Sequence, residues 1–529
     1  MQASIAFGED YTISQDEGSC GLHSVSGTRK RVADAQELSH TCLPPHQMES
    51  LPQPLRDAVK ALEDQFTVST ERLKTITDHF VSELEKGLSA EGGSIPMNPT
   101  WVMALPTGHE TGTFLALDVG GTNLRVCQVT LSEKQSEFEI IQSKYKIPDE
   151  LKVGNSHDFW EYQADCVQQF IKTHHPNPIK KKLPLGFTFS YPATQHYINH
   201  GILQRWTKGF DVSGVEGENV VPLFEAALEK RGVPIAVVAL INDTTGTLVA
   251  SAYVDPKVRV GCIFGTGCNA AYMENCGAIP KLAHLNLPED APMAINCEWG
   301  AFDNEHLVLP RTPYDVTIDE LSPRKGQQAY EKMVAGLYLG ELWRLVVLDL
   351  HEKGLVFKGQ DVSNLKVSYS LDSSLPSIIE ADETGNLQGT KEVIQTKLGV
   401  ACTDDELKVL RRISELIGTR AARLTACGLA AICKKKGWNQ CHVGADGSVF
   451  QKYPHFKERQ ANAMGEILGW PEKTDPKAEY PIEVLAAEDG SGVGAALIAA
   501  LTYERVRAGN TAGVYKPEIF SETGDPTKD

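Results

Sequence analysis

Three apolar segments of this chain each run into a short polar turn that carries glycine. They are FLALDVGGTNLRV (114–126), VGCIFGTGCNAAYME (260–274) and HVGADGSVFQKYP (442–454). Apolar, β-branched runs of this length bounded by glycine are typical of strands, and glycine adopts the backbone angles that a tight turn needs. Because the pattern recurs, we expect strands on both sides of each turn, in two lobes of related architecture whose glycine turns face a common cleft.

The first of these turns, DVGGTN (118–123), has two interpretations. Gly-Gly followed by Asn is ordinary turn chemistry, because both residue types tolerate a positive φ. Alternatively, small side chains let a phosphate approach the backbone N–H groups, and a threonine hydroxyl adds a further donor. The second turn, with Gly265, Thr266 and Gly267, has the same two interpretations.

Gly265, Gly267 and Ala270 also fit the GxGxxA fingerprint of dinucleotide-binding folds. That fingerprint requires a helix directly after the turn. The segment NAAYMEN (269–275) is followed at once by CGAIP, which leaves too little chain for such a helix. A nicotinamide-dependent oxidoreductase is therefore disfavoured, and the absence of a GxxxxGK(S/T) motif excludes a P-loop nucleotide-binding protein.

A last glycine cluster, DGSGVG (489–494), precedes the apolar segment AALIAALTYERV (495–506). Glycines in such a place either allow close packing of a helix or leave room for a ligand beside the helix N-terminus. The sequence leaves both interpretations open.

The length and the charge of the chain limit its class. A chain of 529 residues exceeds what one hydrophobic core usually supports, so two lobes or domains are expected. Its 69 acidic and 51 basic residues give a formal net charge of -18, which repels phosphate backbones and argues against a nucleic-acid partner.

Cysteine usage and hydropathy bear on the compartment. Twelve cysteines are scattered without a CxxC pair, which suits a reducing compartment and argues against a zinc site. No run approaches the roughly 20 apolar residues that span a bilayer, and the first residues lack the features of a secretory signal. We therefore expect a cytoplasmic protein with no membrane association, and the sequence does not decide between a monomer and a weak dimer.

Helical patterns are clearest in two places. An amphipathic helix with apolar residues at three- and four-residue spacing is expected to stop at Gly87. A longer helix is expected from about Gln327 to Lys353. Residues 1–47 show no periodic apolar pattern, so we expect a disordered extension, with order beginning near Met48.

Carboxylate, amide and hydroxyl residues occur at several places beside apolar runs. Asn242 and Asp243 stand between an apolar strand and the opening of a helix, where such a residue is more commonly an N-cap. Similar polar residues recur at Ser190, Thr207, Lys208, Glu298 and Glu331. This set suits a polyhydroxylated sugar, because carboxylates and carboxamides donate to and accept from neighbouring hydroxyls in pairs.

Nine segments in order resemble the eukaryotic hexokinase family: DVGGTNLRV, LGFTFSYPAT, RWTKGF, NDTTGT, GCIFGTGCNAAYME, INCEWGAFDNE, YEKMVAGLYLGE, GADGSVFQKYP and EDGSGVGAAL. The variants SYP, IFGTGCNAAYME and EWGAFDNEHLVLP are most similar to fungal glucokinases. The resemblance extends over roughly residues 48–505, and nine ordered motifs are far more specific than any one of them.

The resemblance implies an α/β fold, the two-lobed actin-like (ribonuclease-H-like) ATPase fold, with a sugar cleft between a small and a large lobe. The large lobe would comprise residues 48–109 and 243–490, and the small lobe residues 110–242 and 491–529. It also implies phosphorylation of glucose at the 6-hydroxyl, the first step of glycolysis, with Mg²⁺ as cofactor and ATP as phosphoryl donor.

The resemblance also assigns a role to each matching position. Asp243 is the implied base that takes the proton of the sugar 6-hydroxyl, with Lys208 as a second catalytic residue. The residues implied to bind the sugar are Ser190, Thr207, Lys208, Asn242, Asp243, Asn269, Glu298 and Glu331. Those implied to surround the nucleotide are Asp118, Gly120, Gly121, Thr122, Asn123, Gly265, Thr266, Gly267, Ser448, Gly490 and Ser491. Asp118 would act on magnesium through water.

Two positions depart from the family pattern. Ala445 stands where a β-branched residue or Cys is common, and Glu488 where Lys or Ser is usual. Because Glu488 adds negative charge near a polyphosphate, we expect it to weaken nucleotide binding slightly.

A glucose sensor of the same fold, with little catalysis, is the alternative function. Its mark would be the loss of Asp243, Lys208 or a glycine of the phosphate turns, and all of these are present. Catalysis is therefore favoured. The sequence does not rank glucose, mannose and fructose as substrates, because these sugars differ by few contacts.

Overall fold

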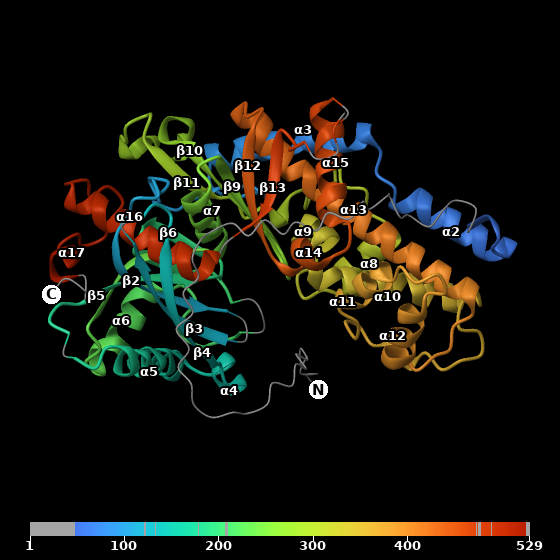
Figure 1. Cartoon of the computed structure of the whole chain (residues 1–529), viewed down its shortest axis with the longest axis horizontal. Helices are drawn as coiled ribbons and strands as arrows, with labels where there is room; N and C mark the ends of the chain where they lie inside the picture. Colours follow the sequence, from blue (N-terminus) through green and yellow to red (C-terminus); the bar gives the residue numbers. More distant parts are fainter. Residues whose placement is uncertain are drawn as a thin grey trace.

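The computed structural model describes residues 48–120, 123–132, 134–177, 179–206, 210–471, 473, 475, 478–487 and 489–524. Its framework is two mixed β-sheets, one of five strands and one of six, each with helices packed against it (Figure 1). We call the part built on the five-stranded sheet the small lobe and the part built on the six-stranded sheet the large lobe. The predicted extension, residues 1–47, lies outside the described residues.

The small-lobe sheet has the strand order β4-β3-β2-β5-β8. Its strands are β2 (Gly112–Val119), β3 (Asn123–Leu131), β4 (Phe138–Lys146), β5 (Leu183–Phe189) and β8 (Ile235–Ile241), and a separate ladder pairs β6 (Ala193–Tyr197) with β7 (His200–Leu203). β2 and β3 pair antiparallel over their whole length, whereas β5 runs parallel to both β2 and β8. The hairpin predicted around the first glycine turn is thus confirmed.

Helices cover both faces of the small-lobe sheet. Leu115 of β2 packs in one apolar cluster with α5 (Ser156–His174) and α6 (Val220–Lys230). Its neighbour Ala116 faces the other side, where α16 (Ala495–Arg507) packs. Successive side chains of a strand point to opposite faces, so a strand covered on both sides reads as a continuous apolar run. The short helices α4 (Asp149–Lys152) and α17 (Ile519–Glu522) lie at the edges of this lobe (Figure 1).

The large-lobe sheet has the strand order β1-β11-β10-β9-β12-β13. Its strands are β1 (Asn98–Pro99), β9 (Val258–Phe264), β10 (Cys268–Asn275), β11 (Pro292–Asn296), β12 (Cys441–Asp446) and β13 (Ile482–Ala486). β9 and β10 form the second hairpin with a glycine turn. A strand, not a helix, follows that turn, which confirms that the dinucleotide fingerprint does not apply.

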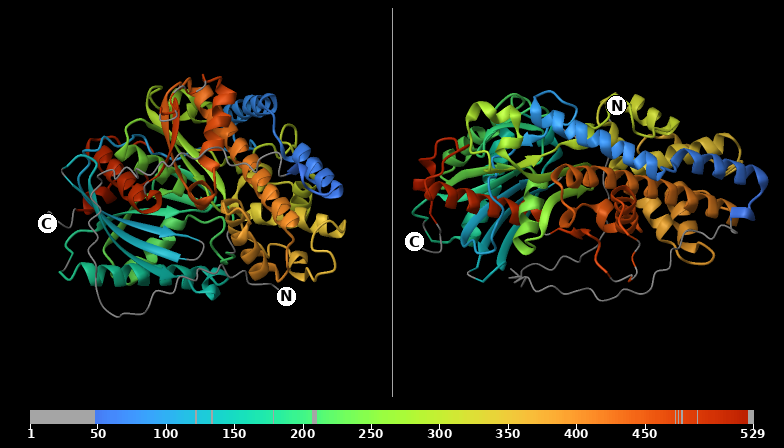
Figure 2. Two further views of the ribbon diagram at one scale, coloured as in Figure 1. Left: turned by 45° about the vertical axis from the view of Figure 1, so that its right-hand side comes forward. Right: turned by 90° about the horizontal axis from the view of Figure 1, so that it is seen from above.

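The helices of the large lobe pack around α13, which runs from Asp404 to Lys436. They are α2 (Gln53–Phe66), α3 (Thr70–Ser89), α8 (Pro313–Leu321), α9 (Ala329–Val334), α10 (Gly336–Glu352), α11 (Ser374–Ala381), α12 (Gln388–Leu398), α14 (Ser448–Lys452) and α15 (Phe456–Leu468). Figure 2 shows α2 and α3 running alongside α13. By length and composition α13 could span a membrane, but 89% of its most apolar window is buried inside the protein, which accounts for its hydrophobicity.

The two lobes meet where α7 (Asp243–Val254) crosses the helical turn η5 (Gly490–Gly494). A side chain at Gly246 would lie 2.2 Å from Gly490 O, and one at Gly494 would lie 2.3 Å from Gly246 O. Only glycine permits this approach, so the DGSGVG cluster serves close packing. The lobe boundaries at residues 110, 243 and 491 stay predictions.

The long helix predicted over 327–353 is wrong in one respect, because it is two helices. α9 ends at Val334, Ala335 is extended with ψ 147°, and α10 begins at Gly336. The N–H groups of Gly336 and Leu337 donate to the carbonyls of Gly265 and Thr266, at 2.8 and 3.3 Å. The second glycine turn therefore takes the first N–H groups of α10, and the break lies where helix and turn meet.

Two further expectations also need correction. The third glycine turn lies between β12 and helix α14, not between two strands, because the segment after Gly447 forms backbone bonds of helical type. Gly87 does not stop α3, which continues to Ser89. A side chain at Gly87 would lie 2.0 Å from Ile95 O, so glycine is required there by the segment that folds back over the helix.

We expect Gly87→Ala to lower the free energy of unfolding by about 1 to 3 kcal/mol, because the added methyl group forces the segment around Ile95 away from α3. Gly93→Ala is the matched control, since its new Cβ would have no neighbour closer than 3.5 Å. Urea unfolding of both variants measures the difference. Equal stability of the two variants would contradict the packing argument.

Candidate active site

The first part of the candidate site is a hydrogen-bonded set of amides and a carboxylate. Asn269 of β10 donates from Nδ2 to Asn296 Oδ1 at 2.8 Å and to Glu298 Oε1 at 3.1 Å. Asn296 Nδ2 also donates to Glu298 Oε1, at 2.8 Å, and the backbone N–H of Glu298 donates to Asn269 Oδ1 at 2.9 Å. These bonds fix the Glu298 carboxylate in place without help from a ligand.

Glu298 also has an unusual backbone. Its φ is 55° and its ψ is 44°, in the left-handed region that residues other than glycine seldom adopt. Strained backbone of this kind clusters at ligand sites, where the surrounding bonds maintain it. Here the bonds to Asn269 and Asn296 do so, and they aim the carboxylate at the site.

Glu331, on the first turn of α9, lies over the second glycine turn. Its Oε2 accepts from the backbone N–H of Cys268 at 3.0 Å, and its Oε1 accepts from Gln328 Nε2 at 3.3 Å. A side chain at Gly267 would lie 2.8 Å from Glu331 Oε2, and one at Gly300 would lie 3.2 Å from Glu331 Cβ. Both glycines therefore make room for this carboxylate.

Asn242 and Asp243 lie at the start of α7, directly after β8. Asn242 Oδ1 accepts from the backbone N–H of Thr244 at 2.9 Å, so the N-cap interpretation of Asn242 is confirmed. Asp243 is half-buried, and its Oδ1 accepts from Thr244 Oγ1 at 3.2 Å. The cap sets the direction of the first turn of α7 and thereby the position of the Asp243 carboxylate.

Each of the first two glycine turns is closed by a backbone hydrogen bond, and the second turn packs against the third. Gly120 N donates to Asn123 O, and Gly265 N donates to Gly267 O, both at 3.0 Å, which closes each turn. A Cβ at Gly265 would lie 3.4 Å from Gly447 Cα, so the second and third turns are in contact. Gly447 has φ 112°, and a side chain there would lie 2.4 Å from Phe264 O.

Carboxylates gather beside these turns, with one arginine between them. Arg125 of β3 donates to both carboxylate oxygens of Asp489, at 2.5 and 2.6 Å, and lies 3.5 Å from Asp118. Burial raises the pKa of Asp446, and the carboxylates of Asp489 and Asp243 raise it further, although the Gly447 N–H donated to Asp446 opposes this. These four acids therefore share one electrostatic environment.

Three more predicted residues lie next to these turns. Ser190 follows β5 and precedes Tyr191, whose hydroxyl donates to Gly120 O at 3.3 Å. Ser448 is exposed at the first position of α14. The carbonyl of Ser491 accepts from Thr188 Oγ1 at 2.8 Å.

The predicted residues thus fall into two connected groups. Asn269, Glu298 and Glu331 form a group on the large lobe, and Asp118 and Asp243 belong to the carboxylate group, with the turn from Gly265 to Gly267 touching both groups. Four predicted residues, Gly121, Thr122, Thr207 and Lys208, lie outside the described residues, as does Glu488. The roles of all site residues stay predictions.

Four residues of the site were not singled out from the sequence. Arg125, Asn296, Asp446 and Asp489 all lie within or next to the quoted motifs, and each makes the contacts described above. The sequence contained a usable signal for Arg125, because an arginine two residues after a predicted phosphate turn can pair with phosphates or with carboxylates beside them. Asn296 carried none, since its contact with Asn269 joins two strands, and the sequence alone does not show that they are neighbours.

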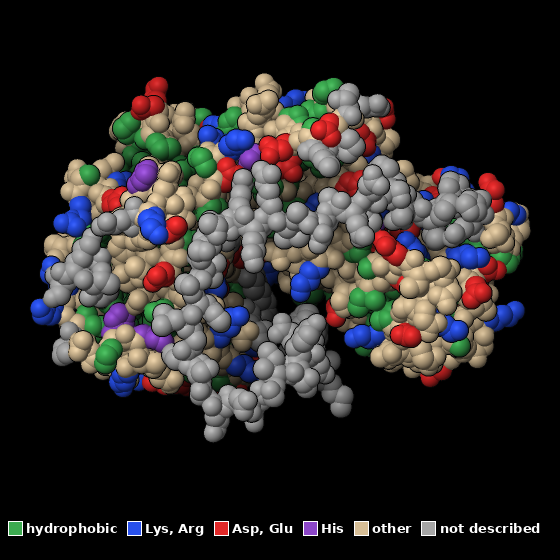
Figure 3. All heavy atoms as spheres, in the orientation of Figure 1, with side chains coloured by type: hydrophobic (Ala, Val, Ile, Leu, Met, Phe, Trp, Pro, Cys, Tyr) green, Lys and Arg blue, Asp and Glu red, His purple; other side chains and the backbone are tan. Residues whose placement is uncertain are grey.

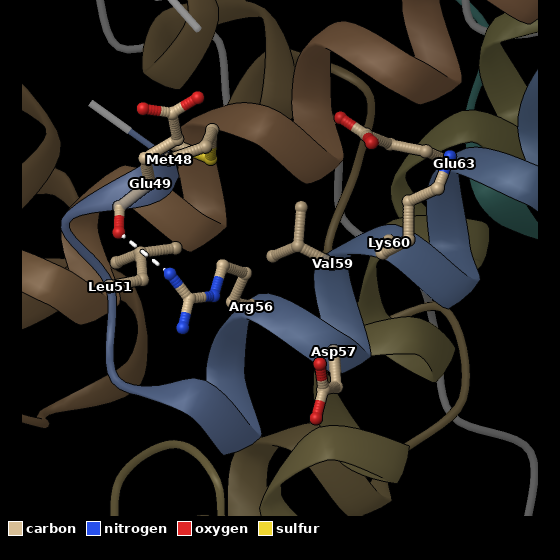
Figure 4. A pocket seen from close by; sticks show the side chains of 8 residues that line it. All are labelled: Met48, Glu49, Leu51, Arg56, Asp57, Val59, Lys60 and Glu63. Atoms are coloured by element: carbon tan, nitrogen blue, oxygen red, sulfur yellow. Dashed lines mark hydrogen bonds between the residues drawn. The ribbon is translucent and has the colours of Figure 1, made fainter. Parts of the chain in front are cut away.

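A separate cavity of about 250 Å³ lies at the start of α2 (Figure 4). It is lined by Met48, Glu49, Leu51, Arg56, Asp57, Val59, Lys60 and Glu63. Arg56 Nη1 donates to Glu49 O there, at 3.0 Å. None of the predicted site residues lines this cavity, whereas Figure 3 shows a hollow between the two lobes.

Two sheets that each carry glycine turns, joined through a close helix crossing, define the class of protein: the fold is the two-lobed actin-like ATPase fold. Two family models, each described as hexokinase, match residues 58–253 and residues 259–501. The chain belongs to the hexokinase family.

Known proteins and structures agree with this assignment. The chain is 63% identical to a hexokinase from Emericella nidulans, over 88% of this chain and 95% of that protein. It is 37% identical to a glucokinase from Aspergillus niger, over 84% of this chain and 97% of that protein. The structure of a hexokinase from Schistosoma mansoni complexed with glucose matches with a TM-score of 0.75 and 36% identity, over 84% of this chain and 99% of that chain. The predicted family is confirmed, and identity to the fungal hexokinase exceeds identity to the fungal glucokinase.

We expect Asp446→Asn to raise the melting temperature at pH 7 when no nucleotide is present. The pKa of Asp446 is raised in the folded protein, so folding favours its protonated form and stability falls as the pH rises above the ordinary range of the carboxyl. Asparagine keeps an acceptor for Gly447 and Gln451 and does not ionise. Melting curves from pH 4 to pH 8 measure the difference, which should disappear toward about pH 4.

Asp290→Asn is the control for this experiment, because Asp290 is an exposed carboxylate remote from the glycine turns. Its melting temperature should match that of the parent protein at every pH. An Asp446→Asn variant that melts at or below the parent temperature at pH 7 would contradict the repulsion between the carboxylates.

Proposed function

We propose that this member of the hexokinase family transfers the γ-phosphoryl group of ATP to the 6-hydroxyl of glucose. The observation that carries the proposal is the position of Asp243. It lies at the end of β8 and the start of α7, the helix that crosses η5 at the junction of the lobes, and it belongs to the carboxylate group beside the glycine turns. A base in that place lies between a sugar on one side and a polyphosphate on the other.

The sugar would be bound by carboxylates and amides that already hold one another. Asn269 and Glu298 are bonded to each other through side chain and backbone. Glu331 accepts from the backbone N–H of Cys268, directly after the second glycine turn. Sugar hydroxyls then meet acceptors of fixed geometry, and a sugar with a misplaced hydroxyl leaves a half-buried polar group without its partner. This arrangement favours glucose, with other hexoses as weaker substrates.

The chemical step requires little from the protein beyond position and charge. Asp243 accepts the proton of the 6-hydroxyl as the oxygen attacks the γ-phosphorus, the bond between that phosphorus and the β–γ bridging oxygen breaks, and ADP leaves. Other backbone N–H groups of the glycine turns would stabilise the negative charge of the phosphates. Closure of the lobes excludes water, which is the competing acceptor.

The donor set of the site fits magnesium. In nucleotide sites Mg²⁺ is usually bound by one or two carboxylates together with water and phosphates, and seldom by an all-protein cage. Among the described residues, no group of three or more His, Cys, Asp or Glu side chains is arranged to hold a metal ion. Asp118 would hold the ion through water, and when bound the ion neutralises phosphate charge.

We also place the protein in the cytoplasm and its reaction at the start of glycolysis. The ten cysteines in the described part of the chain are all free, and nine of them are buried, which suits a reducing compartment. The glucose-sensor alternative has no observation in its favour.

We expect Asp243→Asn to lower turnover by about a hundredfold to ten-thousandfold, the usual effect of losing a general base, while glucose still binds. Asparagine keeps the shape and the acceptor oxygen for Thr244 but cannot take the proton. Steady-state kinetics and glucose titration calorimetry measure the two effects separately. Asp290→Asn serves as the control and should keep full turnover. Turnover of Asp243→Asn equal to that of the parent would rule out Asp243 as the base.

Magnesium-dependent ADP release tests the activity as a whole and separates the alternatives. We expect strong release with glucose, weaker release with mannose and fructose, and little without sugar, because water is excluded when the lobes close around a sugar. Release that is equal with glucose and fructose would indicate a general hexokinase. Glucose binding without any release would instead favour the sensor hypothesis and contradict the kinase.

A further inference from the structure

One hydrogen bond joins the two lobes on the sugar side of the site. Arg324 lies between α8 and α9 of the large lobe, and its Nη2 donates to the carbonyl of Trp206 at 3.0 Å. Trp206 belongs to the apolar cluster of the small lobe. The bond therefore connects the two lobes at a point apart from the crossing of α7 and η5.

The Trp206 end of this bond is fixed to the small lobe. The indole Nε1 donates to Val212 O at 2.9 Å, and the backbone N–H donates to Glu216 Oε1 at 2.6 Å. The indole ring stacks on Phe210 and meets Tyr191 edge-on, and the residue is only 5% exposed. The carbonyl that Arg324 binds is thus a fixed point of the small lobe, immediately before Thr207 and Lys208.

The Arg324 end is fixed to the large lobe in a similar way. The Arg324 carbonyl accepts from Lys332 Nζ at 2.7 Å, and Lys332 Nζ also donates to Asp319 Oδ1 at 2.7 Å. Lys332 is only 4% exposed, so the loop before α9 is anchored by a buried ion pair. Gly326 N donates to the same Asp319 oxygen at 3.0 Å, which holds the loop at a second point.

The two anchors stand next to the predicted sugar contacts. Lys332 directly follows Glu331 on α9, and Trp206 directly precedes Thr207 and Lys208. The charged groups that act on Arg324 are Arg205 and Glu216 on the small lobe and Glu331 on the large lobe. Arg324 thus lies on the sugar side of the cleft, between the two segments that would meet around a hexose.

We propose that Arg324 is a positioning residue that clasps the small-lobe segment at Trp206 to the sugar-binding helix α9 and so favours the closed arrangement of the lobes. This inference rests on the proposed function of the same site. A bond between lobes is lost when they separate, so it adds to the stability of the closed form alone. Glucose binds most tightly to the closed form. Loss of the bond lowers the fraction of protein in the closed form, and the apparent affinity for glucose falls by the same factor.

This role of the hydrogen bond between Arg324 and Trp206, which we call the clasp, predicts a particular kinetic change. In Arg324→Ala we expect KM for glucose to rise about fivefold to fiftyfold, the effect of losing a partly exposed hydrogen bond from a charged group. We expect kcat to change by less than about threefold, because once glucose saturates the enzyme the reacting groups are unaltered. Arg324→Lys should recover part of the affinity, since an ammonium group also donates to a carbonyl.

Lys325→Ala is the matched control. Lys325 is the next residue, it is exposed, and its Nζ pairs with Glu320 on the surface at 2.5 Å, so its loss removes the same charge without touching the clasp. Its KM for glucose should equal that of the parent. All variants should keep the parent melting temperature, because the clasp joins the lobes and does not support either core.

Small-angle scattering during a glucose titration without ATP measures closure directly. We expect Arg324→Ala to reach the compact form only at higher glucose, by the same factor as its KM. The inference is overturned if Arg324→Ala closes at the parent concentration, if Lys325→Ala has an equal effect, or if kcat and the melting temperature fall together with affinity. Because this titration needs no phosphoryl transfer, a parent protein that closes on glucose but releases no ADP would contradict only the proposed function.

Discussion

Gly246 of α7 and Gly490 of η5 pass so close that a side chain at Gly246 would lie 2.2 Å from the Gly490 carbonyl. Asp243 opens the first of these elements, and Asp489 caps the second by accepting from Gly492 N. The crossing therefore sets the distance between the implied base and the carboxylate that pairs with Arg125 of the small-lobe sheet. A change at the crossing moves both acids at once, because close-packed elements transmit a displacement to their neighbours.

The acidic character of the chain has a local counterpart in the site. Asp118, Asp243, Asp446 and Asp489 lie where a triphosphate would add further negative charge. Arg125 offsets two of these carboxylates, but it does not offset the triphosphate as well. This excess of negative charge explains why the reaction would depend on a divalent cation.

Much of the fold followed from local patterns, and the errors have one physical origin. The hairpins at Gly120 and at Gly265 were predictable because a strand pair and its turn are set by neighbouring residues. The break at Ala335 was not, since the N–H groups of α10 bond to a turn some 70 residues earlier in the chain. Gly87 was misread as a helix stop because a helical pattern does not show that the carbonyl of Ile95 folds back onto it. Of the site, most residues inside motifs were predictable, whereas the role of Asn296 depends on its contact with Asn269 across neighbouring strands.

The sugar side and the phosphate side of the site are built differently. On the predicted sugar side, Glu298 accepts from two amides and Glu331 accepts from a backbone N–H. The carboxylates of the large lobe are therefore preorganised in the absence of a ligand. On the small lobe, Trp206 is anchored in the aromatic cluster of that lobe, and the predicted sugar-binding residues Thr207 and Lys208 follow it in the sequence. Under the proposed function, sugar recognition therefore requires residues of both lobes. Under that proposal, the turn at Gly120 of the small lobe and the turns at Gly265 and Gly447 of the large lobe would act together on the phosphates. Binding of the sugar and assembly of the phosphate site would then be coupled, which would tie the use of ATP to the presence of a sugar acceptor.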